Sequence, residues 1–425
     1  MAAMTLAQKL VARAAGRESV LPGEIVTCQV DLAMFHDSSG PRRLKPMLAE
    51  LGAQIWDKRK VVLVIDHYVP EADDESRRIV RIARDWAKAE ALPFVYDSQG
   101  ICHVVVPQHG HIRPGMFCVG GDSHSPTGGA FGSYMFGIGA TEMLGVVVTG
   151  EIWLKVPQTI FMRWMGRLTA GVSAKDMLLA MLGRFGMNGG PDGSYQAVEF
   201  CGEAVTALSM AERMTLANMS AELGAQVGLV APDQTTRQWL EERSVDIDEL
   251  GLARWHSDED APGVRHSFDA SGLAPQVALP HSPANVRPVD DLEPTPVNVA
   301  YIGACTGAKL EDLRAAARVL AGYKVAPGVQ LLVAPASVRD REIAEREGVL
   351  RMLTEAGATL LPSACGACAG YGGVIPAGST VISSTARNFR GRMGAADAQV
   401  YLGSPYTVAA SALRGRISDA REMLA

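Results

Sequence analysis

The sequence predicts an α/β fold in which short buried strands alternate with amphipathic helices. Each of the strongest predicted strands leads into a loop that begins a helix, which is the order typical of an open α/β sheet. The length of 425 residues corresponds to about three domains of roughly 150 residues each. Glycine contributes 44 of the 425 residues, or about 10%, against a usual ~7%. This excess indicates many tight turns and places where backbone approaches a ligand.

The first elements are a helix, a strand and a second helix. Thr5 and Gln8 form a capping box that begins the first helix, and Gly16 ends it. Val61–Ile65 is a continuous apolar run, typical of a buried strand. The helix that follows carries its apolar residues on one face, namely Ile79, Ile82, Ala83 and Trp86.

The same order continues along the chain. Phe117–Val119 is predicted to be a short strand that leads into a glycine-rich stretch from Gly120 to Gly139. Val297–Ile302 is predicted to be another strand, followed by a helix over Leu310–Leu320 and a further strand over Val329–Val333. These repeated strand–loop–helix units favour a parallel sheet.

Two predicted boundaries divide the chain into three units. Five prolines fall between Pro280 and Pro296, where the sequence is also acidic, and this stretch is predicted to be an extended connector. A second boundary is placed near Pro157, after the glycine-rich stretch and its helix. The predicted units are therefore 1–156, 157–285 and 286–425.

Charge and composition exclude several classes of protein. The 40 basic and 46 acidic residues give a net charge of −6, whereas a general nucleic-acid-binding protein carries a basic excess. No apolar run reaches the ~18 residues that a membrane-spanning helix needs. Seven cysteines, an odd number, occur without a secretory signal. This pattern favours a reducing compartment, and a cytoplasmic location is expected.

Three cysteines are candidates for a metal centre. Cys365 and Cys368 form a C-x-x-C motif, which is open to a redox pair, half of a zinc site or chance. Cys305 lies between a predicted strand and a predicted helix, where the helix N-terminus is expected to favour a thiolate. Three thiolates are one short of the usual four of an iron–sulfur cluster, which leaves one position for substrate. The other cysteines are interpreted mostly as buried structural thiols: Cys28, Cys102, Cys118 and Cys201.

Candidate acid–base groups gather at the ends of predicted strands. Asp66 and His67 follow one strand, Asp122 and His124 follow another, and His103 lies between the two pairs. Sites in α/β proteins form at such strand ends, and an aspartate beside a histidine can orient the imidazole and tune its pKa. Each pair taken alone is more typical of a structural loop.

A basic turn follows the strand-like stretch Ser379–Ser384. Arg387 and Arg392 in this turn are candidate carboxylate ligands, because a guanidinium group binds a carboxylate through two hydrogen bonds. On charge alone, however, a solvated basic turn is favoured over a carboxylate-binding site.

Several motifs together resemble one family. The order of Gly303-Ala304-Cys305-Thr306, Cys365-Gly366-Ala367-Cys368 and Arg387-Asn388-Phe389 is similar to the aconitase superfamily. Within it, the sequence most resembles the large subunits of 3-isopropylmalate dehydratase and of homoaconitase. Three further stretches, from about Thr5 to the C-terminus, extend the likeness: Gly121–Thr127, Asn218–Glu222 and Tyr401–Pro405.

The resemblance implies a three-domain α/β/α architecture and a [4Fe-4S] cluster. The cluster cysteines would be Cys305, Cys365 and Cys368, with one iron left without a cysteine ligand to bind the substrate hydroxyl and a carboxylate. The implied reaction is reversible loss and addition of water on a malate-type acid. Such an iron acts as a Lewis acid in this chemistry.

The resemblance also implies roles for individual side chains. Asp66 and His67 would handle the departing hydroxyl, while two further pairs would surround the bound water, namely His103 with Asp122 and His124 with Glu222. The substrate itself, and above all its carboxylates, would contact Ser123, His36, Arg387 and Arg392.

In single-chain relatives a fourth, swivelling domain supplies a serine base and further arginines. This chain is expected to lack that domain and to be the large subunit of a heterodimer whose small subunit provides it. The chain alone would then have little or no activity. The expected substrate is 3-isopropylmalate, in leucine biosynthesis, with homocitrate, 2,3-dimethylmalate and a methylcitrate-like acid as alternatives.

Two residues depart from the family pattern. Gly307 and Ala386 stand where the family commonly has asparagine, and both changes remove an amide near the expected cluster. Three readings from other classes stay open here. They are an RNA-binding relative without a cluster, a structural zinc site on the same three cysteines, and a thiol–disulfide enzyme.

Overall fold

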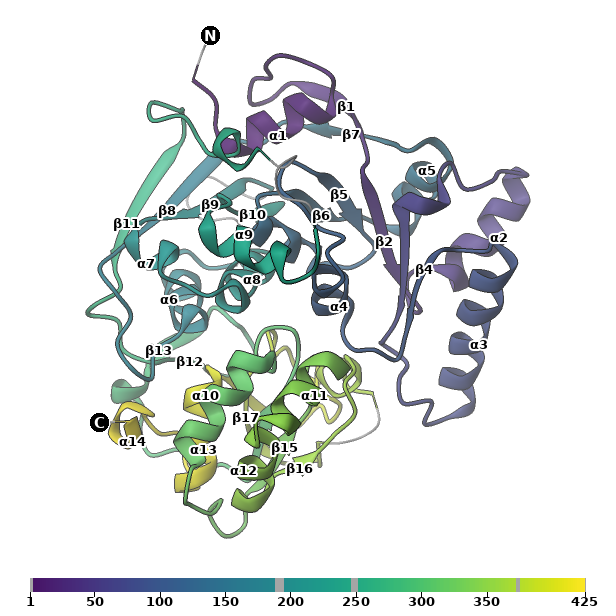
Figure 1. Ribbon diagram of the computed structural model, residues 1–425. Coiled ribbons are helices and arrows are strands. Elements are labelled where there is room, and N and C mark those ends of the chain that lie inside the picture. Colours follow the sequence, from purple (N-terminus) through teal and green to yellow (C-terminus); the bar gives the residue numbers. More distant parts are fainter. Residues whose placement is uncertain (1–2, 188–194, 246–250, 372–374, 425) are drawn as a thin grey trace.

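A computed structural model describes residues 3–187, 195–245, 251–371 and 375–424. Three sheets and one two-stranded ribbon form its framework. In Figure 1 the first and second sheets lie side by side in the upper half, and the third sheet with its helices lies below them. The ribbon pairs β1 (Ile25–Gln29) with β7 (Glu151–Lys155) in antiparallel register.

The first sheet has five parallel strands in the order β4-β3-β2-β5-β6. The strands are β2 (Leu32–His36), β3 (Val61–Ile65), β4 (Phe94–Asp97), β5 (Phe117–Gly120) and β6 (Tyr134–Gly137). The helices of this part are α1 (Leu6–Ala14), α2 (Pro41–Leu51), α3 (Asp74–Ala89), α4 (Cys102–Gln108) and α5 (Ala140–Thr149). Both β2 and β3 are buried along their whole length, as expected for central parallel strands.

The second sheet has four parallel strands in the order β10-β9-β8-β11. The strands are β8 (Thr159–Met165), β9 (Ala197–Cys201), β10 (Val227–Val230) and β11 (Val264–Asp269). Its helices are α6 (Ala174–Phe185), α7 (Glu203–Thr206), α8 (Met210–Met219) and α9 (Gln234–Glu241).

The third sheet has seven strands in the order β13-β12-β18-β17-β14-β15-β16. The strands are β12 (Gln276–Ala278), β13 (Val286–Pro288), β14 (Val299–Ile302), β15 (Gln330–Val333), β16 (Thr359–Leu360), β17 (Thr380–Ser383) and β18 (Gln399–Leu402). The last five run parallel, and β12 pairs antiparallel with both of its neighbours. The helices are α10 (Leu310–Leu320), α11 (Val338–Arg346), α12 (Val349–Ala356), α13 (Pro405–Arg414) and α14 (Arg421–Leu424).

The α/β architecture predicted from the sequence is confirmed. The capping box of Thr5 and Gln8 is present at α1, and the predicted bounds of β3 and α10 match the structure. The stretch Pro280–Pro296 is predicted to be an extended connector. The structure bears this out only in part, because the stretch contains β13. The units 1–156, 157–285 and 286–425 stay a prediction, and the third sheet crosses the 285/286 boundary because β12 pairs with β18.

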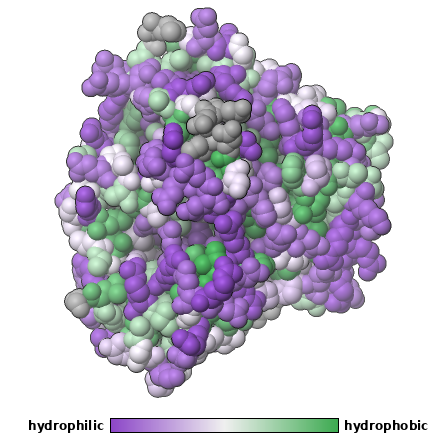
Figure 2. Space-filling model, viewed as in Figure 1, coloured by the Kyte–Doolittle hydropathy of each residue, from purple (hydrophilic) through white to green (hydrophobic). Residues whose placement is uncertain are grey.

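One core cluster joins the first sheet to the third sheet. It includes Met34 and Val64 from the first sheet and Ala300 and Ile302 from the third. The face shown in Figure 2 is largely hydrophilic, and its hydrophobic residues form separate small groups. In the described part of the chain, no helix combines the length and apolar character needed to cross a membrane.

Candidate active site

A pocket of about 320 Å³ lies between the first and third sheets. One side, here called the acid–base wall, consists of His36, His67, His103, Asp122 and His124. The opposite side, here called the cysteine wall, consists of Cys305, Cys365, Cys368, Arg387 and Arg392. The pocket therefore brings together almost all of the predicted site residues.

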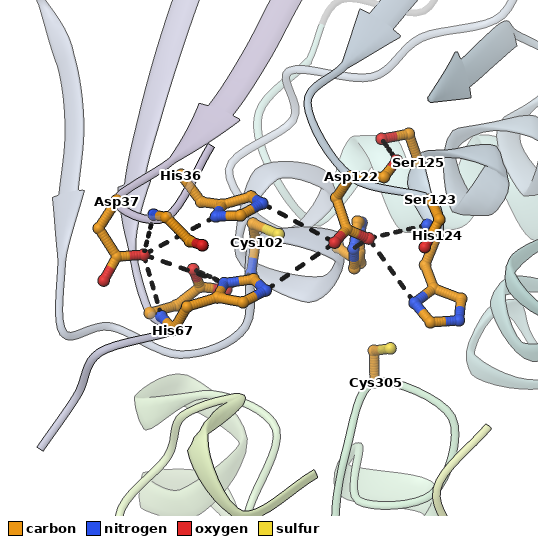
Figure 3. A network of polar contacts seen from close by, with 12 residues as sticks. His36, Asp37, His67, Cys102, Asp122, Ser123, His124, Ser125 and Cys305 are labelled. Atoms are coloured by element: carbon orange, nitrogen blue, oxygen red, sulfur yellow. Dashed lines mark hydrogen bonds and ion pairs between the residues drawn. The ribbon is translucent and has the colours of Figure 1, made fainter. Parts of the chain in front are cut away.

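The acid–base wall stands at the carboxyl ends of parallel strands. His36 is the last residue of β2, Asp66 and His67 follow β3, and Asp122 comes soon after β5. These three strands are neighbours in the sheet. In Figure 3 His36 and His67 lie one above the other and face Asp122, and Cys305 comes from a separate loop. Neighbouring parallel strands thus bring residues far apart in sequence to one edge.

Asp66 lies on the side of the His67 ring away from the pocket and fixes its orientation. The carboxylate lies 2.7 Å from His67 Nδ1 and also accepts a 2.7 Å hydrogen bond from the Cys102 backbone. Burial lowers the pKa of His67, but the adjacent charge and hydrogen bond of Asp66 outweigh it and raise that pKa to about 10. His67 is therefore a cation at neutral pH. Asp66 does not line the pocket and acts on it through His67.

His36 is the neutral member of a stacked histidine pair. Its ring lies on the His67 ring with centroids 3.8 Å apart and an interplanar angle of 11°. Neither ring nitrogen has a hydrogen-bond partner among the described residues. The nearest carboxylates are those of Asp37 and Asp122, each 3.8 Å away. Burial, aided by the His67 charge, lowers the pKa of His36 to about 3, so two stacked rings carry one positive charge.

Asp122 is the central acceptor of the acid–base wall. Its Oδ1 lies 2.7 Å from His103 Nε2 and accepts a 2.7 Å hydrogen bond from the His124 backbone. Burial would raise the pKa of Asp122, but the His103 hydrogen bond and the nearby histidines lower it well below its ordinary value. The carboxylate therefore stays ionised and can orient the His103 ring.

His124 belongs to a second chain of contacts that reaches the cysteine wall. Its Nε2 lies 3.0 Å from Glu222 Oε1, and the same oxygen accepts a 2.6 Å hydrogen bond from Arg387 Nε. Arg387 also donates to Ser123 Oγ at 3.0 Å. The contacts of His124 and Arg387 lower the pKa of Glu222 although burial alone would raise it. Glu222, like Asp66, does not line the pocket and lies behind its histidine.

Cys305 is held by a tight loop and by an amide. Ala304, the residue before it, adopts the left-handed region at φ +69°, a conformation that costs about 1–2 kcal/mol for a residue with a side chain. Asn218 Nδ2 donates to Cys305 Sγ at 3.2 Å. Cys305 does not lie at a helix N-terminus as expected, because α10 begins only at Leu310, after the N-cap residue Lys309. Burial instead raises the pKa of the Cys305 thiol to about 12.

Cys365 and Cys368 lie on a loop that contacts Asp66, the residue behind His67 of the acid–base wall. The Cys365 backbone donates to the Asp66 carbonyl oxygen at 3.1 Å. The hydrogen bond from Cys365 and the nearby Arg392 charge lower the pKa of Cys368 below its ordinary value. Among the described residues, no three cysteine sulfur atoms all lie within 4.8 Å of one another. A single tetrahedral zinc ion, with Zn–S bonds of about 2.3 Å, needs sulfur atoms about 3.8 Å apart, closer than these three sulfur atoms all lie to one another.

The two departures from the family pattern occupy crowded positions. A Cβ atom added at Gly307 would lie 2.3 Å from both Ser384 Cβ and Ser384 Oγ, so the Ser384 side chain fills the space of the missing amide. Ala386 is buried in an apolar cluster beside the second sheet and also lines the pocket. Gly307 thus faces Ser384, and Ala386 packs against apolar side chains.

Three polar residues near the cysteine wall have no role assigned from the sequence. Asn218 lies within a motif that carries the family resemblance, Lys175 lies within the largely apolar helix α6, and Lys309 is the N-cap residue of α10. All three are buried. A lysine in an apolar helical pattern is the signal that could have singled out Lys175.

Comparison with known proteins gives consistent results. The sequence pattern of the aconitase family (aconitate hydratase) matches residues 8–415. The chain belongs to the aconitase family. It is 40% identical to the 3-isopropylmalate dehydratase large subunit 1 of Methanopyrus kandleri over 99% of each chain. It is 38% identical, over 98% of each chain, both to the 3-isopropylmalate dehydratase large subunit of Desulfatibacillum aliphaticivorans and to a protein of Methanothermobacter thermautotrophicus named a probable methanogen homoaconitase large subunit.

The family defines the coarse chemistry of this chain. As an aconitase-family member, the chain is a hydro-lyase, and enzymes of the family generally carry a [4Fe-4S] cluster. Among solved structures, Thermococcus kodakaraensis aconitase X in its holo-form has a TM-score of 0.49 and 11% identity, over 85% of this chain and 84% of that chain.

Proposed function

We propose that this chain is the large subunit of a [4Fe-4S]-dependent enzyme that reversibly dehydrates 3-isopropylmalate. The supporting observation is that three cysteines, two histidine–carboxylate pairs and two arginines meet at one pocket. The names of the matched relatives support this substrate and a small-subunit partner in a heterodimer. The proposal includes a place in leucine biosynthesis.

Cys305, Cys365 and Cys368 would hold the cluster. All three thiols are free and line the pocket, and Asn218 donates a hydrogen bond toward one of them. When bound, such a cluster supplies a Lewis acid at an iron that lacks a cysteine ligand and can bind the substrate hydroxyl.

The acid–base wall would move protons at the departing hydroxyl. His67 is the proton donor, since its raised pKa keeps it charged and Asp66 fixes its ring. His103 with Asp122 and His124 with Glu222 would orient the released water through their paired rings. The base that removes the carbon-bound proton would come from the small subunit.

The cysteine wall would bind the substrate carboxylates. Arg392 lines the pocket, and its Nε has no partner among the described residues. Arg387 and Ser123 already contact each other at the pocket and would offer their remaining hydrogen-bonding capacity. His36, neutral and without a partner at either nitrogen, would contact the substrate from the β2 side.

The test is reconstitution of the chain with its small subunit. We expect iron and sulfide to load anaerobically, and dehydration of 3-isopropylmalate to require both cluster and partner. The formation of the unsaturated acid is followed by ultraviolet absorbance, with homocitrate and 2,3-dimethylmalate as competing substrates. Zinc or no metal after reconstitution, or no turnover by the loaded pair, would overturn the proposal.

One alternative substrate has specific support. The Methanothermobacter thermautotrophicus homoaconitase relative matches this chain with 38% identity over 98% of each chain, almost as well as the isopropylmalate relatives. A higher kcat/KM for homocitrate than for 3-isopropylmalate in the same assay would assign the chain to that reaction.

A further inference from the structure

Lys175 is a buried lysine behind the cysteine wall. It lies in the first turn of α6, in the second sheet's part of the chain, and only 1% of its surface is exposed. Its ammonium group donates to the carbonyl oxygens of Ser384 and Thr385, the latter at 2.7 Å. Ser384 and Thr385 directly precede Ala386 and Arg387 of the pocket, so Lys175 holds this loop from the side away from solvent.

Lys175 lacks a nearby counter-ion of its own. In the described part of the chain, no carboxylate oxygen lies within 4.0 Å of its ammonium nitrogen. The contrast is Lys309, equally buried, whose ammonium lies 2.9 Å from the Asp312 carboxylate. Burying an unpaired charge is strongly unfavourable, and burial indeed lowers the pKa of Lys175 to about 7. Carbonyl oxygens alone therefore do not explain an ammonium group at this place.

The Lys175 contact leads directly to the cysteines. The Ser384 carbonyl that accepts from Lys175 also accepts a 2.9 Å hydrogen bond from Thr306 Oγ1, the residue after Cys305. Ser384 Oγ accepts a 2.9 Å hydrogen bond from the Gly303 backbone, two residues before Cys305. Against the lowering effects of burial and of the Lys309 charge, the more distant Asp312 carboxylate raises the pKa of Lys175 most, and charges on Cys368 and Cys305 raise it further. A negative charge gathered on the cysteines is thus felt at Lys175.

We propose that Lys175 is a positioning residue that supplies the internal counter-charge of the cysteine-bound cluster. The inference rests on the proposed function. An oxidised [4Fe-4S] core with two positive charges and three thiolates has a net charge of minus one, and net charge is one determinant of the reduction potential of such clusters. In a low-dielectric interior, an ammonium group close to that charge makes addition of an electron easier. Removing the Lys175 charge must therefore make the cluster harder to reduce.

The experiment compares Lys175→Met with wild type in the reconstituted complex of large and small subunits. We expect the midpoint potential of the cluster, followed by electron paramagnetic resonance during an anaerobic redox titration, to shift to a more negative value. Met181→Leu is the matched control because Met181 is fully buried on the same helix and the change alters packing without charge. Lys175→Arg, which keeps the charge, should shift the potential less than Lys175→Met.

The outcomes separate the two proposals. If wild type loads no cluster, the proposed function fails. If wild type loads a cluster and Lys175→Met keeps the wild-type potential, or shifts it no further than Met181→Leu, the counter-charge inference alone is overturned. Should Lys175→Met not fold, Lys175→Gln decides instead, because it retains amide donors for the two carbonyls and removes the charge. A wild-type potential in that variant also overturns the inference.

Discussion

The acid–base wall and the cysteine wall differ in how far each is satisfied by its own residues. On the acid–base wall, His67 and His103 each lie 2.7 Å from a carboxylate. On the cysteine wall, Arg392 Nε has no partner among the described residues and no disulfide joins the thiols, although Cys305 accepts from Asn218 and Arg387 pairs with Glu222. Apart from His36, hydrogen bonds preorganise the histidines of the first wall, whereas on the second wall a guanidinium nitrogen and the thiols stay available at the pocket. The difference fits the proposal that the cysteine wall holds the cluster and the acid–base wall acts on the substrate.

The largest effect should come from removing a thiol of the cysteine wall. Cys365→Ser is expected to lose iron and to reduce dehydration by the reconstituted complex by roughly a thousandfold or more, because the Lewis acid supplies several kcal/mol of transition-state stabilisation. Iron content and initial rates measure this. Cys201→Ser is the matched control, since Cys201 is a half-buried thiol that does not line the pocket. Full iron content in Cys365→Ser would contradict the assignment.

The acid–base wall should respond differently to mutation. Asp122→Asn removes the negative charge beside the His103 ring but no thiol, so dehydration should fall by about 10²–10⁴-fold, the range of general acid–base catalysis, while iron content stays at the wild-type level. Rates and iron analysis on the same preparation test the separation of the two walls. Equal loss of iron in Asp122→Asn and Cys365→Ser would show that the walls do not act separately.

Packing behind the cysteine wall predicts a stability effect. Gly307→Ala should destabilise the chain by about 1–3 kcal/mol, because the new Cβ overlaps Ser384 and overpacking costs that much. The free energy of unfolding in urea measures it. Gly145→Ala is the control: no atom lies within 4 Å of a Cβ added there in α5, and a helical alanine should stabilise by about 0.5–1 kcal/mol. A neutral Gly307→Ala would show that Ser384 can move aside.

The last prediction concerns how the stability supplied by the acid–base wall depends on pH. The folded pKa of His67 is about 10, above the value of about 6.5 in an unfolded chain. Its contribution to stability is therefore complete below about pH 6.5 and is lost as pH rises toward 10, at up to about 1.4 kcal/mol per pH unit. Urea unfolding of wild type and His67→Gln across this range measures the difference. The same pH dependence in both proteins would refute the raised pKa.

Local features of the fold were predictable from sequence, and long-range pairings were not. The bounds of α10 and β3 follow from apolar spacing within each segment. The strand β13 was missed because prolines dominate its surroundings and its partner β12 lies outside the predicted connector. Sequence motifs brought the cysteines, histidines and arginines to attention. The high pKa of Cys305 and the contacts of Lys175 depend on burial by distant segments, which no local pattern reveals.

The distribution of the two walls along the chain has a consequence for biogenesis. The strands and the helix α4 that position His36, His67, His103 and Asp122 all lie within the first 137 residues, so most of this wall can form while the rest of the protein, including the His124 partner Glu222, is still being synthesised. The other wall needs residues up to Arg392, and its loop docks on the first through the Cys365–Asp66 backbone hydrogen bond. Under the proposed function, cluster insertion therefore comes after translation of nearly the whole chain, beside an acid–base wall most of which is already formed.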